Sequence, residues 1–448
     1  MPAKQLIFLL LTLLVVPAAA WFGIRYRWAE RLLVVGVFLS STYLVDINLV
    51  SMEAYRGDTR GFEFGVTDWM VIALIVTMAR SPRWRRERLQ LLPPNAVPIL
   101  AYLAIAALGV AFAYVPLYAG FGLFKLLRAV AIYWVAYNYL RNERDLRFLL
   151  LVLVAMVSVQ FTLVLWQRAT GLYRAVGSTP HPNTLAVYVN FMNMVFLAFV
   201  LGEKRRSLHT WAAWTGLAMG VLIVLATFSR GALLALAFGF AIVVVLSLWS
   251  RPRASKFVLI GVMALAALPL AIKVTPAIIK RFETAPVESG MSRHQANSAA
   301  LAMARDHFFG VGLNNYSYVV NNTAYADYIP LASDRGIVHN VYLLHASELG
   351  WLGLAAFVLV IARFLWLAIR FIAQRRDDIA SSMAIGIFAG MVTLWSQSLL
   401  EWLFRQTYVT VEFFLLAGLV AALPRVARRT RLERVCKVLL LRHLRAAA

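Results

Sequence analysis

The sequence predicts an all-α polytopic membrane protein with about 12 or 13 transmembrane helices and one large loop outside the membrane. Hydrophobic residues make up 61% of the chain and charged residues only 15%, with a mean hydropathy of +0.73. A soluble globular protein has an apolar fraction nearer one half. Apolar segments of about 17 residues or more, the length that crosses about 30 Å of hydrocarbon, recur along almost the whole chain.

The third observation is the placement of the basic residues. The net charge is +23, and 25 of the 44 Lys and Arg fall in short runs between apolar segments. This is the positive-inside pattern, so these runs are expected on the cytoplasmic side. The cations are not interleaved with aromatic residues on a polar face, which argues against nucleic-acid binding. The runs cover residues 80–88, 141–147, 204–206, 251–256, 370–376 and 425–445.

The first apolar segment, Leu6 to Val16, is followed by three alanines and imitates a secretory signal peptide. We expect it to be retained as a first span. Holding the basic runs inside then places the start of the chain outside, unless one of the first three candidates is re-entrant. The further candidates cover residues 31–50, 66–79, 96–117, 121–140, 147–166, 185–202, 210–228, 231–250, 257–273, 348–369, 381–400 and 408–423.

This alternation predicts four parts of the chain. Residues 1–272 form N-terminal transmembrane helices, 273–347 a large non-cytoplasmic loop, and 348–423 C-terminal transmembrane helices. Residues 424–448 carry eight basic residues among apolar ones, which is typical of an amphipathic helix on an anionic cytoplasmic leaflet.

Arg230 is the one charge in forty residues between Trp211 and Ser250. Forty helical residues span about 60 Å, enough for two crossings, so the bend near Ser229 is expected at the non-cytoplasmic surface. An arginine there opposes the orientation rule and needs a polar partner. It either extends to phospholipid headgroups or binds an anion, and we favour the anion site.

Other cations are expected near the same surface. Lys125 and Arg128, three residues apart on one helix face, begin a span whose other end is cytoplasmic. Arg168 and Arg174 lie in the next outer loop and could equally be solvated loop charges. Converging guanidinium groups would suit a diphosphate, because arginine binds phosphate oxygens bidentately. The double proline beyond Arg174 predicts a rigid turn leading into a span. In this turn, His181 and Asn183 are candidates for supporting the anion site.

The large loop carries its own polar features. A helix is expected from Arg293 to Phe309, followed by a turn at Gly310-Val311-Gly312 that is too weak a signal for a phosphate loop. Tyrosines and asparagines from Tyr316 to Tyr328 suit either sugar binding or a simple folded lid.

His339-Asn340 stands where this loop returns to the membrane. Imidazole can act as a general base near neutral pH, although a lone histidine can equally be structural. We expect no metal or other cofactor, because the outer loops lack Asp-x-Asp and His-x-x-x-His patterns. The nearest metal-ligand candidates are Asp46 and Glu53.

Several of these segments occur in an order that resembles the O-antigen ligase superfamily, which also includes O-antigen polymerases and pilin oligosaccharyltransferases. The resemblance covers most of residues 120–420. The matching segments are Phe228-Ser229-Arg230-Gly231-Ala232-Leu233-Leu234, Arg293, Phe309-Gly310-Val311-Gly312, His339-Asn340 and Glu348-Leu349-Gly350-Trp351-Leu352-Gly353.

The resemblance implies a GT-C-like, inverting, metal-independent glycosyltransferase of the bacterial inner membrane with its site facing the periplasm. Its partners would be an undecaprenyl-diphosphate-linked glycan donor, a lipid A–core acceptor and the bilayer. It implies that Arg230 contacts the diphosphate and that His339 is the base, with Asn340 in a supporting role. Lys125, Arg128 and Arg293 match less directly.

Two other functions stay open. An O-antigen polymerase would use the same donor with a second lipid-linked repeat as acceptor, and the sequence does not separate it from a ligase. A transporter or flippase would place charges near the membrane midplane and show two similar halves, whereas here the charges collect at one surface.

Overall fold

The computed structural model describes residues 3–85, 89–203, 207–283 and 287–446. The basic residues predicted at 86–88 and 204–206 lie outside the described residues. In order, the helices and strands are α1 (Ala3–Arg25), α2 (Arg27–Thr42), β1 (Asp46–Ser51), β2 (Gly61–Gly65), α3 (Val66–Arg80), α4 (Pro82–Arg85), α5 (Ala96–Ala111), α6 (Pro116–Tyr139), α7 (Glu143–Ala169), α8 (Pro182–Gly202), α9 (Leu208–Thr227), α10 (Arg230–Ser250), α11 (Ala254–Glu283), α12 (Val287–Asp306), α13 (Tyr316–Asn322), η1 (Ala324–Tyr328), η2 (Ala332–Asp334), α14 (Val341–Ile372), α15 (Ile379–Gln397), η3 (Leu403–Arg405) and α16 (Thr407–Ala446).

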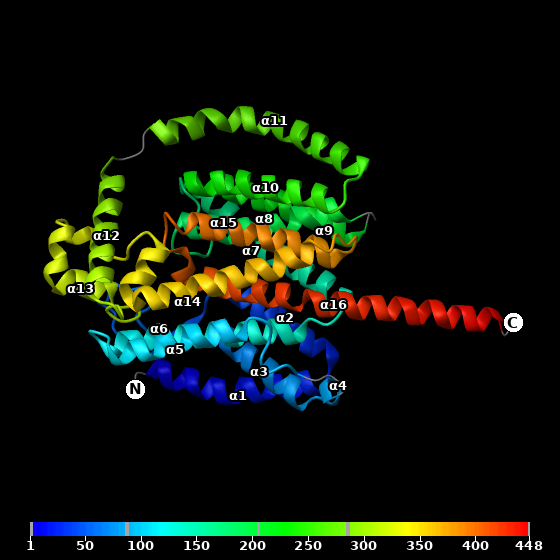
Figure 1. Ribbon diagram of the computed structural model, residues 1–448, viewed down its shortest axis with the longest axis horizontal. Coiled ribbons are helices and arrows are strands. Elements are labelled where there is room, and N and C mark those ends of the chain that lie inside the picture. The colour runs from blue at the N-terminus through cyan, green and yellow to red at the C-terminus, as the bar shows by residue number, and fades with distance from the viewer. Residues whose placement is uncertain (1–2, 86–88, 204–206, 284–286, 447–448) are drawn as a thin grey trace.

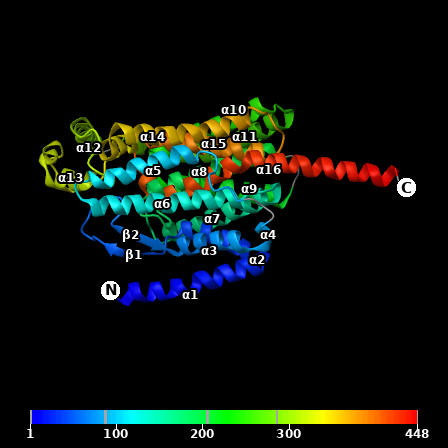
Figure 2. The ribbon, with the colours of Figure 1, turned by 60° about the horizontal axis from the view of Figure 1, so that its bottom comes forward.

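The long helices run side by side along one axis of the molecule (Figure 1, Figure 2). Within the described residues, nine are long and apolar enough to cross a membrane, and two shorter apolar helices lie at Ala96–Ala111 and Ala254–Pro269. The chain is therefore a multi-pass membrane protein that is mostly α-helical. The number of crossings stays a prediction.

Helix α8 forms the centre of the bundle, with all but its ends buried among α9, α10 and α15. Helix α11 differs, because it arcs over α10 and stands away from the bundle (Figure 1). Large apolar side chains on α11, among them Val258 and Leu265, are exposed. In a bilayer such a surface faces lipid.

The expected span at 31–50 is wrong in its second half, because α2 ends at Thr42 and β1 pairs antiparallel with β2. Asp46, Asn48 and the apolar residues between them alternate, which favours a strand over a helix. At Gly61 the hairpin is close-packed, since a Cβ there would lie 2.3 Å from the carbonyl oxygen of Val50. Within the described residues, this hairpin is the only β-structure in an otherwise helical fold.

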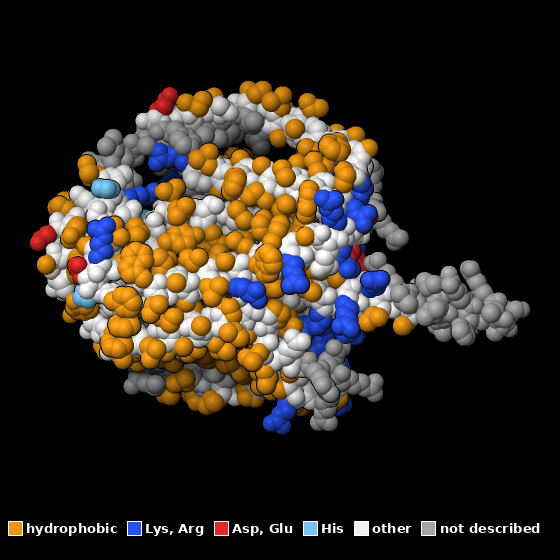
Figure 3. All heavy atoms as spheres, viewed as in Figure 1, with side chains coloured by type: hydrophobic (Ala, Val, Ile, Leu, Met, Phe, Trp, Pro, Cys, Tyr) orange, Lys and Arg blue, Asp and Glu red, His pale blue; other side chains and the backbone are white. Residues whose placement is uncertain are grey.

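The two ends of the bundle differ in chemistry. At one end lie the described basic runs, at the junctions between α6 and α7, α10 and α11, and α14 and α15, and Figure 3 shows many of these Lys and Arg side chains there. At the other end lie the hairpin and residues 287–340, which we call the lid (Figure 1). The start of α1 is at the lid end, where Gln5 donates to the carbonyl of Asn48 at 2.9 Å.

Helix α14 contains a break at Gly350, whose φ of 68° and ψ of −175° are not helical. The break frees carbonyl groups of the preceding turn. Val311 N donates to Ser347 O and Gly312 N to Glu348 O, both at 2.9 Å. The Gly-x-Gly turn therefore binds the broken helix, which explains it without a phosphate.

Two predicted helical features are confirmed. The forty apolar residues around Arg230 form two helices, α9 and α10, separated by a turn at Phe228 and Ser229. The helix expected at 293–309 is present as α12, although it begins earlier and ends at Asp306.

The last helix, α16, continues through Pro424 without a break and extends beyond the bundle (Figure 1). Its place on a leaflet stays a prediction.

Candidate active site

His339 lies at the lid end, immediately before α14. Asn340 is the N-cap of that helix, and its side chain accepts hydrogen bonds from the backbone N–H groups of Tyr342 and Leu343 at 3.0 and 3.1 Å. An N-cap fixes the backbone at the start of a helix. Asn340 therefore orients the residue before it, His339.

The imidazole of His339 contacts Glu401, a residue of the segment between α15 and α16. The distance from His339 Nδ1 to Glu401 Oε2 is 2.9 Å. The other carboxylate oxygen, Oε1, accepts from Arg293 Nη2 and from Asn183 Nδ2, each at 2.8 Å. The Glu401 carboxylate thus joins two parts of the lid, α12 and His339, to the start of α8.

This contact determines what the imidazole can do. A neutral histidine that donates Nδ1–H to a carboxylate carries its lone pair on Nε2. The side chain of His339 is 41% exposed, whereas that of Glu401 is 10% exposed. An imidazole held in this way, partly exposed and with a buried carboxylate behind the ring, can serve as an oriented general base.

Glu401 stays ionised in this setting. Burial alone would raise its pKa, but the hydrogen bond and charge of His339, together with Arg293 and Asn183, outweigh it and lower the pKa below its usual value. A carboxylate in this state stabilises the imidazolium that forms when Nε2 takes up a proton.

The outer loop after α7 extends the cluster. Arg174 donates through Nη2 to Asn183 Oδ1 at 3.2 Å and through Nε to the carbonyl of Thr227 at 3.0 Å. His181 accepts from Asn183 N at 3.1 Å and is the N-cap of α8. Burial is the main cause of a lowered pKa at His181, so this imidazole is neutral near neutral pH.

Arg230 begins α10, three residues after the carbonyl that Arg174 binds. A Cβ on Gly231 would lie 3.7 Å from Gln397 Nε2, and Gln397 ends α15, four residues before Glu401. The start of α10 is therefore at the same end of the bundle as His339, next to the segment that carries Glu401.

Arg168 has a different setting. Its Nη1 donates to the carbonyl of Leu172 at 3.0 Å and to that of Tyr173, and its guanidinium lies 5.7 Å from the ring of Phe228. These contacts stabilise the loop after α7 and the turn between α9 and α10. Within the part of the chain that the structure describes, Arg168 makes no direct polar contact with Glu401 or His339.

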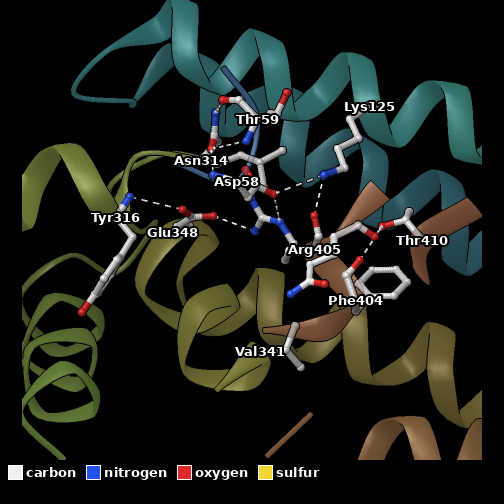
Figure 4. A network of polar contacts seen from close by, with 12 residues as sticks. Asp58, Thr59, Lys125, Asn314, Tyr316, Val341, Glu348, Phe404, Arg405 and Thr410 are labelled. Atoms are coloured by element: carbon white, nitrogen blue, oxygen red, sulfur yellow. Dashed lines mark hydrogen bonds and ion pairs between the residues drawn. The ribbon is translucent and has the colours of Figure 1, made fainter. Parts of the chain in front are cut away.

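A second cluster, drawn in Figure 4, surrounds Arg405. Arg405 is buried and binds Asp58 Oδ2 through Nε and Glu348 Oε2 through Nη1, both at 2.7 Å. Lys125 Nζ lies 3.8 Å from Asp58 Oδ2 and donates to the carbonyl of Arg405. Burial alone would raise the pKa of Asp58, but Arg405 and Lys125 lower it.

Arg128 belongs to this carboxylate-rich region too. Its Nε and Nη2 bind the two oxygens of Asp68 at 2.8 Å, and its Nη1 lies 3.7 Å from Glu63. Lys125 and Arg128 are at the lid end, as expected. Both, however, have carboxylate partners of their own from or beside the hairpin, so the structure gives them a place in the framework instead of bringing them to His339.

Sequence reasoning missed Glu401 and Arg405, the residues that organise the two clusters. The available signal was a pair of opposite charges in an otherwise apolar outer loop, Leu399-Leu400-Glu401-Trp402-Leu403-Phe404-Arg405. A charge flanked by apolar residues in a loop is expected to have a buried partner. The predicted residues that the structure does bring together are His339, Arg293, Arg174, Asn183 and His181.

The match to a known family covers this same region. Residues 215–358, which include the turn before α10, α12, the lid and the first part of α14, match the model of the family described as O-antigen ligase. The comparison with curated proteins found no match. Residues 215–358 therefore form a segment that matches the O-antigen ligase family, which supports the relationship that the sequence motifs indicate.

Proposed function

We propose that this protein is an inverting, metal-independent glycosyltransferase. It moves an O-antigen polysaccharide from undecaprenyl diphosphate to a sugar of the lipid A–core, at the periplasmic face of the bacterial inner membrane. The match to the O-antigen ligase family supports a transferase that uses lipid-linked glycans. The positive-inside pattern supports a periplasmic position for the lid end.

The observation that carries the proposal is the contact between His339 and Glu401 beside several cations. Arg293 reaches the cluster from α12 and Arg174 from the loop after α7, and Arg230 starts α10 beside it. These groups are far apart in the sequence, and they lie at the same end of the bundle. Several guanidinium groups at one place suit a diphosphate, because arginine binds phosphate oxygens bidentately.

The chemical step follows from this arrangement. Nε2 of His339 takes the proton of an acceptor hydroxyl, and the oxygen attacks the anomeric carbon from the side opposite the diphosphate. The bond between that carbon and the phosphate oxygen breaks, the configuration inverts, and undecaprenyl diphosphate leaves with the bonding electrons. Arg230, Arg174 and Arg293 stabilise the growing negative charge, and one such contact is typically worth about 100- to 1,000-fold in rate.

A lateral route for the lipid carrier is also supported. Figure 3 shows an opening beside α10, under the arch of α11, with Lys or Arg side chains near it. The apolar face of α11 is exposed. A polyprenyl chain could lie in lipid against α10 and α11 while its diphosphate reaches the start of α10.

The product of an in vitro reaction tests this function and separates it from the alternative. Purified protein is incubated with lipid-linked polysaccharide and with either lipid A–core or a second lipid-linked repeat. We expect a lipopolysaccharide ladder with lipid A–core. A lengthened lipid-linked glycan and no ladder would instead make the protein an O-antigen polymerase, and no transfer to either acceptor would contradict the proposal.

A further inference from the structure

A polar cavity lies at the basic end of the bundle, opposite to the end that carries His339. Its volume is about 530 Å³, and it is formed where α2 begins, α3 ends, α6 meets α7, and α16 passes. Nothing in the proposed transfer reaction uses it. The lining residues are Arg27, Glu30, Arg31, Pro82, Arg83, Trp84, Tyr139, Arg141, Asn142, Asp145 and Arg429.

The two carboxylates of this cavity already have partners. Glu30 Oε2 lies 3.2 Å from Arg83 Nη2. Asp145 Oδ2 accepts from the backbone N–H groups of Arg141 and Asn142 at 3.1 and 3.2 Å, and these hydrogen bonds help to cap the start of α7. Five arginines therefore line a cavity that holds two carboxylates. The charges of Arg27 and Arg31 act on Asp145, but its hydrogen bonds go to backbone N–H groups.

Arg27 and Arg31 are two of these five arginines, and neither is the main partner of Glu30 or Asp145. They lie four residues apart on α2, so they share one face of that helix, and both are exposed. Like charges at this spacing destabilise a helix unless an anion lies between them. Arg141, stacked 3.4 Å from the ring centroid of Trp84, also lines the cavity.

The surroundings indicate where such an anion comes from. Beside the two arginines, α2 exposes Trp28 (59%) and Leu32 (57%) to the outside of the bundle. Aromatic residues are typical of the membrane–water interface, and basic pockets between transmembrane helices bind anionic headgroups. Arginine suits phosphate because its fork binds two oxygens at once.

We propose that this cavity binds a phosphate group held between Arg27, Arg31 and Arg141, and that the group belongs to the headgroup of an anionic phospholipid in the leaflet at the basic end. The acyl chains lie against Trp28 and Leu32. The bound lipid fixes α2 to the start of α7 at the end of the bundle where the chain carries most of its positive charge. A free phosphate offers the same chemistry, so the test separates the two sources.

The experiment measures ligand-dependent thermal stability of the full chain in a neutral detergent, after delipidation. Three probes are titrated: phosphatidylglycerol, phosphatidylcholine and inorganic phosphate. The test variant is Arg27→Gln with Arg31→Gln. The control is Arg80→Gln with Arg144→Gln, which removes the same charge from two exposed positions at the same end that do not line the cavity.

We expect phosphatidylglycerol to stabilise the wild type and the control, phosphatidylcholine to have little effect, and the test variant to need at least about 10-fold more phosphatidylglycerol. Equal stabilisation by inorganic phosphate, lost in the same variant, would keep the site and assign it to a soluble anion. The proposal is overturned if the test variant and the control respond identically to all three probes.

Discussion

Glu401 and Arg405 lie four residues apart in the segment between α15 and α16, and each holds one end of the first part of α14. Glu401 binds His339 just before that helix, and Arg405 binds Glu348 just before its break at Gly350. At the start of α14, Val341 N also donates to Ser398 O at 3.0 Å. The segment between α15 and α16 therefore fixes the first part of α14 at both ends, and with it the position of the candidate base His339.

Replacing Glu401 by glutamine should slow transfer without unfolding the protein. Glutamine keeps the shape but loses the charge that stabilises the imidazolium. A general base contributes about 10²- to 10⁴-fold, and we expect a loss of about 100-fold in kcat with little change in KM. The measurement is steady-state transfer, with Glu53→Gln, an exposed glutamate, as control. Equal loss in both variants would argue against a specific role for Glu401.

Replacing Arg405 by methionine should destabilise the fold. It leaves Asp58 and Glu348 buried without their main cation, and breaking a buried pair in this way typically costs about 3 to 5 kcal/mol. Thermal unfolding in detergent measures the loss, and Arg56→Met, at an exposed arginine, is the control.

The Arg405→Met variant also allows a test of whether uncompensated buried charge causes the loss of stability. Adding Asp58→Asn and Glu348→Gln to Arg405→Met removes the uncompensated charges, so part of the lost stability should return. A triple variant that is less stable than Arg405→Met would mean that the shape of the arginine, and not the charge balance, holds this cluster together.

The contribution of Glu401 to stability should depend on pH. Its pKa is lower in the folded chain than its usual 4.5. Above pH 4.5 the contribution is fully present, and it is lost as the pH falls through the lower folded value, because the unfolded chain takes up the proton first. The difference in thermal stability between wild type and Glu401→Gln should therefore shrink as the pH falls below 4.5. A difference that does not change with pH would contradict this account.

Alanine at Gly350 should disrupt the break in α14. A Cβ there would lie 2.0 Å from Phe308 O, at a φ of 68° that side chains rarely adopt. The left-handed conformation alone costs about 1 to 2 kcal/mol, so we expect at least that loss of stability. Gly336→Ala is the matched control, since no atom lies within 4 Å of its Cβ position. Equal unfolding temperatures for the two variants would disprove the role of the break.

Much of the fold could be predicted because lipid imposes simple rules on length, polarity and charge. The turn before Arg230 followed from one charge in a long apolar stretch, and the outer position of Lys125 from the alternation of spans. The first strand of the hairpin was missed because it directly follows an apolar helix, which outweighed the short alternation of Asp46 and Asn48 with apolar residues.

The site could be predicted only in part. His339 was singled out by its place between loop and membrane. Its partner Glu401 is 62 residues away, and nothing local links the two. The partners of Lys125 and Arg128 come from or beside the hairpin, so an incorrect strand assignment also concealed that these cations are neutralised. Tertiary contacts of this kind depend on packing, which local patterns do not encode.

The central claim is that His339 acts as the base in glycan transfer, beside cations that hold the donor. The most direct test is the transfer rate of His339→Ala under saturating donor, together with donor binding, compared with His294→Ala at an exposed position of α12. We predict that His339→Ala loses about 100-fold or more in rate while it still binds donor, and that His294→Ala stays near the wild type. A His339→Ala protein that transfers glycan within a few-fold of the wild-type rate would contradict the account.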